Sequence, residues 1–186
     1  MQWLRDGLDF GGSAREIEAL ARSVDDAGGV TLVPALSGLG APYWEPEARG
    51  LICGLTRGTT RAHIARAALE GIAFQIYDLA RAMELDIGKP IRNFKVDGGA
   101  TENDLLLQFQ ADLLRRRVVR PQITSTTALG TALLAGLNVG LFRSQAALRK
   151  VWREDRDFRA RMRPSETTRR LAAWKEAIAR TRLGLS

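Results

Sequence analysis

Two adjacent glycines, Gly98 and Gly99, separate a short apolar run from the start of an amphipathic segment. Glycine adopts φ > 0 readily and lets the backbone approach a flat ligand with no intervening Cβ. Thr101 and Asp104 have the spacing of an N-terminal capping pair, and the free N–H groups at a helix start favour polar or anionic ligand atoms. The stretch that begins at Val96 therefore predicts a nucleotide-binding turn, although a strand that simply packs closely on a helix uses the same glycines.

Other catalytic chemistries have few residues to draw on. Cys53 is the only cysteine and His63 the only histidine, which argues against a disulfide, a cysteine-based zinc cluster or other transition-metal chemistry. We interpret Cys53 as a small buried residue. A Ser-His-Asp hydrolase would have to use His63, and no nucleophile motif lies near it. Asp97 is a tempting general base, but it precedes the glycine pair, and we interpret it as a structural or nucleotide-side residue.

The elements that must position the turn alternate between helix and strand. Apolar residues recur at three and four from about 60 to 84, which predicts a long helix that ends near Gly88. Its expected buried stripe is Ile64, Ala68, Ile72, Ile76, Leu79 and Met83. A strand over 91–96, a helix over 102–114, a buried strand at 118–119 and a small-residue helix over 126–138 follow. This order predicts a parallel βαβα unit in an α/β layer structure, with ligands bound beyond the strands' carboxyl ends, where Gly98 falls.

The flanking regions are less regular. Residues 1–22 suggest helical pieces, and 30–33 and 51–55 suggest short strands. The loop between them contains Tyr43 and Trp44, whose rings we expect to fill core space. The small residues of the 126–138 helix permit close approach to a sheet or to a ligand. Ser165 is expected to cap a last helix with Leu171, Trp174 and Ile178 along one side.

Length and charge bound the class of protein. The chain has 186 residues, 45% of them hydrophobic, and a formal charge of +7. Thirteen Lys/Arg and five Asp/Glu lie from Arg143 onward, so the surplus belongs to the C-terminal tail. We expect a solvated helical face there rather than a nucleic-acid surface. No transmembrane segment or secretion signal is visible, and a cytoplasmic location is the expectation.

Three stretches carry a resemblance to a known family. The first is Ser37-Gly38-Leu39-Gly40-Ala41-Pro42-Tyr43-Trp44 with Gly54-Leu55-Thr56-Arg57-Gly58-Thr59; the second is Val96-Asp97-Gly98-Gly99-Ala100 with Asn103-Asp104-Leu105-Leu106; the third is Thr126-Thr127-Ala128-Leu129-Gly130. Together they resemble the C-terminal domain of glycerol kinases, within the carbohydrate kinase family.

The resemblance implies an α/β fold of the ribonuclease H-like, actin-like ATPase class, incomplete at its N-terminal side. It divides the chain into residues 1–142, the nucleotide-binding domain, and 143–186, a basic helical extension of that domain. Gly99 and Asn103 match adenine-nucleotide contacts, and Gln2 matches a further one. The implied cofactor is ATP or ADP with Mg²⁺, the metal being held mainly by parts of the family's enzymes that lie upstream of these residues, as does the catalytic aspartate.

The implied reaction of the full enzyme transfers the terminal phosphoryl group of ATP to glycerol, and we expect this chain alone to be inactive. Glycerol is then a partner of the full-length enzyme only, and a homo-oligomer is expected, since the sheet would have exposed edges. Two alternatives remain: a non-catalytic regulatory or assembly module, and a kinase of another sugar, such as xylulose.

Overall fold

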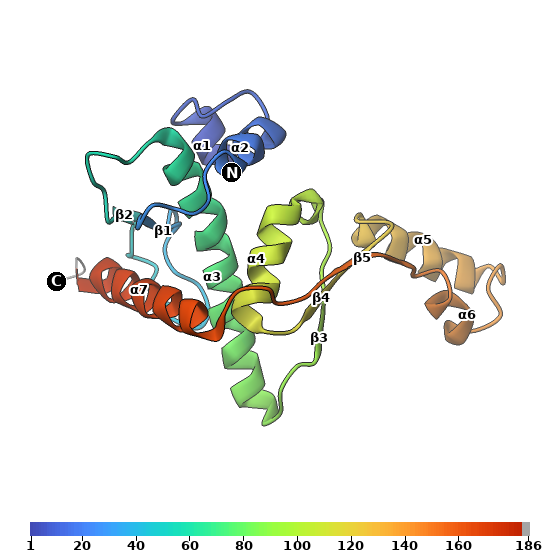
Figure 1. Ribbon diagram of the computed structural model, residues 1–186. Helices are drawn as coiled ribbons and strands as arrows, with labels where there is room; N and C mark the ends of the chain where they lie inside the picture. The colour runs from blue at the N-terminus through green and yellow to red at the C-terminus, as the bar shows by residue number, and fades with distance from the viewer. Residues whose placement is uncertain (184–186) are drawn as a thin grey trace.

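The computed structural model describes residues 1–183, in which helices and short strands alternate (Figure 1). The elements are α1 (Gln2–Asp6), α2 (Ala14–Arg22), β1 (Thr31–Val33), β2 (Leu51–Cys53), α3 (Arg61–Ile87), β3 (Asn93–Lys95), the 3-10 helix η1 (Gly99–Glu102), α4 (Asp104–Leu114), β4 (Arg117–Pro121), α5 (Thr126–Asn138), α6 (Gln145–Arg149), β5 (Glu154–Phe158) and α7 (Pro164–Leu183). Over this described range, no helix combines the length and apolar character needed to cross a membrane.

The long helix α3 is the centre of the packing. Figure 1 shows α4, α7 and the β1–β2 hairpin around it, and α2 packs on its first half. Phe74 of α3 stacks on Trp174 of α7 with ring centroids 5.0 Å apart, and it meets Phe109 of α4 edge-on at 5.4 Å. At Gly71 a Cβ would lie only 2.3 Å from the carbonyl oxygen of Leu32 in β1. A glycine at that position therefore lets the helix lie directly on the strand's backbone.

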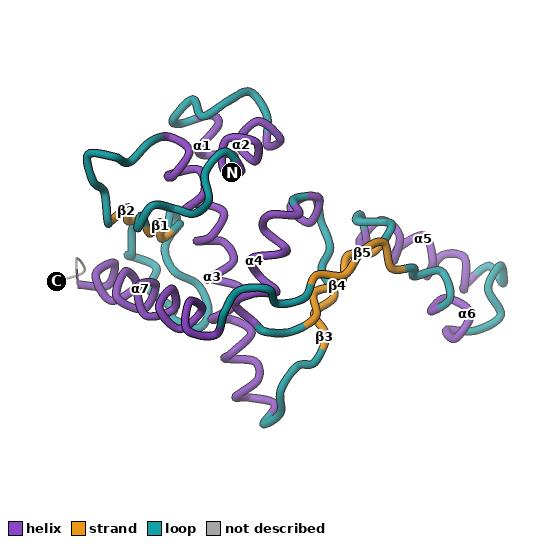
Figure 2. The backbone as a smooth tube through the Cα atoms, in the orientation of Figure 1, coloured by secondary structure: helices purple, strands orange, loops and turns teal. Residues whose placement is uncertain are grey.

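A second, three-stranded sheet has the order β3-β4-β5 (Figure 2). β3 and β4 are parallel, with Phe94 opposite Val118, and β4 and β5 are antiparallel, with Val118 opposite Phe158. Leu107 of α4 belongs to one buried apolar cluster with Val118 and Phe158, so α4 covers one face of the sheet. This arrangement confirms the predicted β-α-β unit. It also leaves β3 as an edge strand of the described sheet.

Most of the expected elements form close to their predicted ends. The helix expected over 126–138 matches α5, and α3 ends at Gly88, whose φ of +69° is the left-handed conformation of a helix C-cap. Leu106, Phe109 and Leu113 of α4 are buried, as the three-and-four spacing predicts. Cys53 packs against the main core, but it is half-buried rather than buried as predicted.

Two expectations about buried side chains and one about a helix cap are wrong. Leu79 and Met83 are 42% and 46% exposed, because the last turns of α3 extend past the elements that cover it. Trp44 is 74% exposed, whereas Tyr43 packs on the core and donates its hydroxyl to Asp78 Oδ2 at 2.7 Å. Ser165 lies inside the first turn of α7, which begins one residue earlier, so it is not the N-cap.

The sequence predicts a helical extension over residues 143–186, but the structure is not helical throughout this tail. Residues 154–158 form β5, and their carboxylates pair with arginines of the neighbouring strand. Arg117 contacts Glu154 and Asp157, and Arg120 contacts Asp155. Cross-strand ion pairs therefore stabilise a strand that has few apolar residues of its own. The division of the chain at residue 142 remains a prediction.

The segment α5–α6 projects away from the rest of the chain (Figures 1 and 2). Only Gly136 of α5 is buried, beside the ring of Phe142 just beyond the helix end. Leu134 is 66% exposed and Val139 78%. The small residues of α5 thus leave an uncharged surface open in the described structure, and the expected approach to a sheet or ligand is not made within it.

Candidate functional site

The predicted turn borders a hollow between α2 and the start of α4, floored by α3. Its volume is about 160 Å³. Figure 1 shows the elements that form it around the upper part of α3. The lining residues are Met1, Ala14, Arg15, Glu18, Leu69, Ile72, Gly99, Ala100, Glu102, Asn103 and Leu106. Two of the three predicted site residues, Gly99 and Asn103, therefore lie together on one wall, above an apolar floor.

Gly98 and Gly99 have different structural roles in the turn. Gly98 has φ +86° and ψ 167°, a conformation that residues with a side chain avoid, and its N–H donates to the carbonyl of Thr124 at 2.8 Å. Gly99 starts η1 without a positive φ, and a Cβ added there would meet nothing within 4 Å. Gly98 therefore makes the turn, while Gly99 leaves open space beside the hollow.

Asn103 is the N-cap of α4. Its side-chain Oδ1 accepts the N–H of Leu106 at 2.9 Å, which satisfies a helix-start donor. The amide oxygen is thus engaged within the helix start, while Nδ2 has no hydrogen-bond partner among the described residues.

The predicted capping pair of Thr101 and Asp104 does not form. Thr101 instead donates its hydroxyl to the carbonyl of Gly98 at 2.7 Å, inside the turn. Asp104 accepts from Arg120 at 2.8 Å, and Arg120 also donates to the carbonyl of Thr101 at 3.0 Å. Arg120 is a half-buried cation of β4, so this network fixes the whole turn to the sheet. The capping prediction failed because Asn103 supplies the cap.

Gln2, the third predicted site residue, lies outside this hollow. It lines an adjoining hollow of about 370 Å³ with Met1, Arg5, Ala14 and Ile17. Met1 and Ala14 line both spaces, so the two are neighbours. Gln2 sits in the first turn of α1, which buried Leu4 holds in place.

Asp97 and His63 both have structural partners. Asp97 accepts the hydroxyl of Thr126 at the start of α5. The ring nitrogen Nδ1 of His63 accepts the N–H of Thr60 at 3.1 Å and completes a capping box at the start of α3. Across residues 1–183, no group of three or more His, Cys, Asp or Glu side chains is arranged to hold a metal ion.

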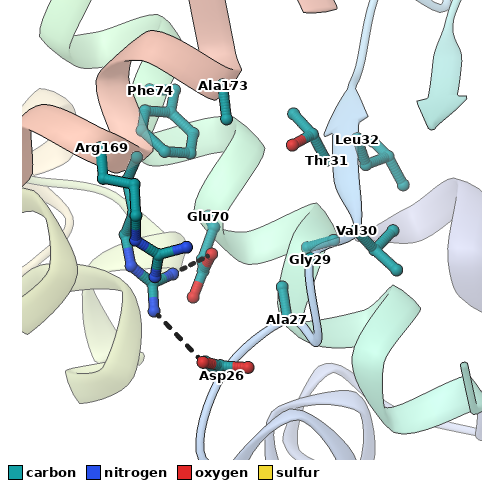
Figure 3. Close-up of a pocket in the computed structure, with 12 residues that line it drawn as sticks. Asp26, Ala27, Gly29, Val30, Thr31, Leu32, Glu70, Phe74, Arg169 and Ala173 are labelled. Atoms are coloured by element: carbon teal, nitrogen blue, oxygen red, sulfur yellow. Dashed lines mark hydrogen bonds and ion pairs between the residues drawn. The ribbon is translucent and has the colours of Figure 1, made fainter. Parts of the chain in front are cut away.

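A further hollow of about 90 Å³, between β1, α3 and α7, is occupied at its edge by an ion network (Figure 3). Arg170 donates to Glu70 at 2.9 Å and lies 3.8 Å from Asp26, and Arg66 donates to Glu70 at 2.9 Å. Burial raises the pKa of Glu70, and the two arginines oppose that rise. The network joins α7 to α3, which makes it a structural feature and not a second ligand site.

Sequence reasoning missed the α2 wall of the candidate site. Arg15 and Glu18 belong to a segment interpreted only as helical, and nothing in their spacing relates them to Gly99. The signal that was available is the alternation of charged residues with Ile17 and Ala21, which are fully buried against α3. That pattern fixes which face of α2 turns inward but not what lies opposite.

Comparison with known proteins defines the class. Residues 1–139 match the sequence model of the FGGY family of carbohydrate kinases, C-terminal domain, and the chain belongs to this family. Its relatives include the glycerol kinases of Dechloromonas aromatica, 59% identical over 97% of the chain, and of Deinococcus radiodurans, 54% identical over 98%. The chain spans about a third, 36%, of the length of either relative.

Solved structures agree with that class. A Plasmodium falciparum glycerol kinase with ADP superposes with a TM-score of 0.86 at 33% identity, over 97% of this chain and 36% of that one. A xylulose kinase from Lactobacillus acidophilus superposes at 0.77 with 24% identity, over 96% and 36%, which shows a shared fold. The predicted α/β, actin-like ATPase fold class is confirmed.

Proposed function

We propose that the chain binds an adenine nucleotide in the hollow beside Gly99 and serves as the nucleotide-binding C-terminal part of an ATP-dependent glycerol kinase. The observation that carries the proposal is the meeting of Gly99 and Asn103 on one wall above the apolar floor. The ADP named in the description of the Plasmodium falciparum structure supports the same ligand class.

The residues present suit the adenosine end of a nucleotide. Leu69, Ile72 and Leu106 give the hollow an apolar floor for a flat ring, and Gly99 leaves room for its edge. The free amide donor of Asn103 can pair with a ring nitrogen or a ribose hydroxyl. The hollow, at about 160 Å³, is smaller than the roughly 300–1,000 Å³ of most small-molecule sites, which fits a base better than a whole nucleotide.

The reaction that we propose for the full kinase is ATP + glycerol → ADP + glycerol 3-phosphate. Phosphoryl transfer needs groups that hold the phosphates and Mg²⁺ and a carboxylate that accepts the hydroxyl proton. We assign these to the rest of the kinase, because the chain spans about a third of its relatives' length. Mg²⁺ would then arrive with the phosphates, and glycerol would bind only to the full-length enzyme.

Two further parts of the proposal concern the setting of the protein. We propose a cytoplasmic protein, because that compartment supplies ATP. We also propose a homo-oligomer, because β3 pairs only with β4 in the described sheet and its other edge is available for association. Sedimentation of the purified chain at several concentrations tests the second point.

Titration calorimetry of the purified chain with ADP, with and without Mg²⁺, tests nucleotide binding. We expect saturable binding that depends little on Mg²⁺, together with no glycerol-dependent ATP turnover above background. No heat of binding at millimolar ADP would contradict the nucleotide assignment. Glycerol-dependent ATP turnover by the purified chain would contradict the assignment of the catalytic groups to the rest of the kinase.

A further inference from the structure

The charged rim of the candidate site contains one arginine with no partner. Arg15, Glu18 and Glu102 all line the hollow. Glu18 accepts two N–H groups of Arg22, at 2.9 and 2.7 Å, and is thereby neutralised. The side chain of Arg15, a residue of α2, makes neither a hydrogen bond nor an ion pair with any other residue of the described range 1–183. It is also the single Lys or Arg among the lining residues.

The backbone that carries Arg15 is firmly held. Ser13 caps α2 by accepting the N–H of Glu16 at 3.2 Å, and the Glu16 carboxylate accepts the hydroxyl of Ser13 at 3.1 Å. Ile17 and Ala21 are fully buried against the core. An exposed, flexible side chain is therefore attached at a fixed point of the wall that faces Gly99.

At Gly99 the opposite wall presents backbone rather than side chain. Gly99 offers no Cβ, and the space in which one would lie is open to a distance of 4 Å. The floor of Leu69, Ile72 and Leu106 is apolar. A flat ring with one face on this floor and one edge against the backbone at Gly99 leaves its other face for the arginine of the α2 wall. A guanidinium is planar and weakly hydrated, and it stacks well on nucleobases.

We propose that Arg15 stacks its guanidinium on the adenine base and so completes the binding site from the α2 side. This inference rests on the proposed nucleotide function. Stacking is favoured over a contact with phosphate because the small, apolar-floored hollow that Arg15 borders suits the base. Arg15 is thus assigned as a binding residue for the base.

The experiment compares adenosine, AMP and ADP as ligands of the native chain and of Arg15→Ala, Arg15→Lys and Arg180→Ala. Arg180 is an exposed helical arginine of α7, paired with Glu176, and its removal changes the net charge equally. Calorimetry gives each affinity, and thermal unfolding confirms that the variants fold. Arg15→Ala is expected to lower the affinity for all three ligands by the same factor, about three- to thirtyfold.

The other variants separate the explanations. Arg15→Lys, which keeps the charge but loses the plane, should recover only part of the loss, and Arg180→Ala should bind all three ligands as the native chain does. A loss confined to ADP and AMP would overturn stacking in favour of phosphate contact, and unchanged affinities in Arg15→Ala would overturn any role for this residue. Failure of the native chain to bind any of the three ligands would instead overturn the proposed function, and this inference with it.

Discussion

Trp174 and Asp78 are joined by a hydrogen bond in which the indole Nε1 donates to Oδ2 at 2.6 Å. The same oxygen accepts the hydroxyl of Tyr43 at 2.7 Å. One carboxylate of α3 therefore ties both α7 and the loop before β2 to the central helix. Burial raises the pKa of Asp78, and the two donors act against that rise.

Replacing Trp174 with phenylalanine should remove one of the two donors while the new ring still stacks on Phe74. A buried acceptor would lose a partner, and we expect the free energy of unfolding to fall by about 1–3 kcal/mol. Urea denaturation measures the change. Trp44→Phe is the matched control, because Trp44 is 74% exposed and its loss should cost little. Equal stabilities for the two variants would refute the role given to the hydrogen bond.

Asp78→Asn should change how stability depends on pH. Because the folded pKa of Asp78 is raised, the folded chain binds this proton more tightly than the unfolded chain. The native protein therefore has this contribution in full below the ordinary pKa of 3.8 and loses it as pH rises through the raised value. Asparagine does not ionise, so the stability of the variant relative to native should increase as the pH rises from about 4 through the raised pKa of Asp78. Denaturation at a series of pH values checks this, and a constant difference would contradict it.

Alanine substitutions at Gly98 and Gly99 should affect different properties, stability in the first case and ligand affinity in the second. Gly98→Ala places a side chain at φ +86° and should cost about 1–3 kcal/mol of stability. In Gly99→Ala the added methyl group has no neighbour within 4 Å, so stability should be nearly unchanged. The methyl group should occupy ligand space and lower the affinity for ADP. Thermal unfolding and calorimetry separate the two effects. A Gly99→Ala variant with native ADP affinity would show that no ligand approaches this residue.

Arg120→Met should destabilise the turn, because it removes the hydrogen bonds that join the turn to β4. Arg120 donates to Asp104 and to the Thr101 carbonyl, and its removal leaves both without that donor. We expect a loss of about 1.5–3 kcal/mol in unfolding free energy and weaker ADP binding. Arg156→Met is the control, because Arg156 pairs with the same Asp104 from a side chain that is 51% exposed and should cost less than about 1 kcal/mol. Similar losses in the two variants would argue against a special role for Arg120.

The sequence predicted best what depends on local periodicity. Helix α4 was predictable because Leu106, Phe109 and Leu113 repeat at helical spacing. Strand β5 was not, because Glu154 to Phe158 contains a single apolar residue and is stabilised by arginines of β4. A pattern within one segment cannot report a partner supplied by another.

The same limit applies to the candidate site. The glycine pair and Asn103 lie within a few residues of each other, so a motif could point to them. Arg15 enters only because α2 and α4 both pack on α3. Which residue caps α4 was also decided by geometry, since Thr101, Asn103 and Asp104 all have side chains able to cap.

The projecting helix α5 implies an uneven distribution of stability within the chain. An isolated helix of 13 residues is marginal in water, and α5 has little tertiary packing to add, whereas α3 is enclosed over most of its length. Amide hydrogens of α5 should therefore exchange with solvent deuterium through local opening. Those in the first half of α3 should exchange only when the whole chain unfolds.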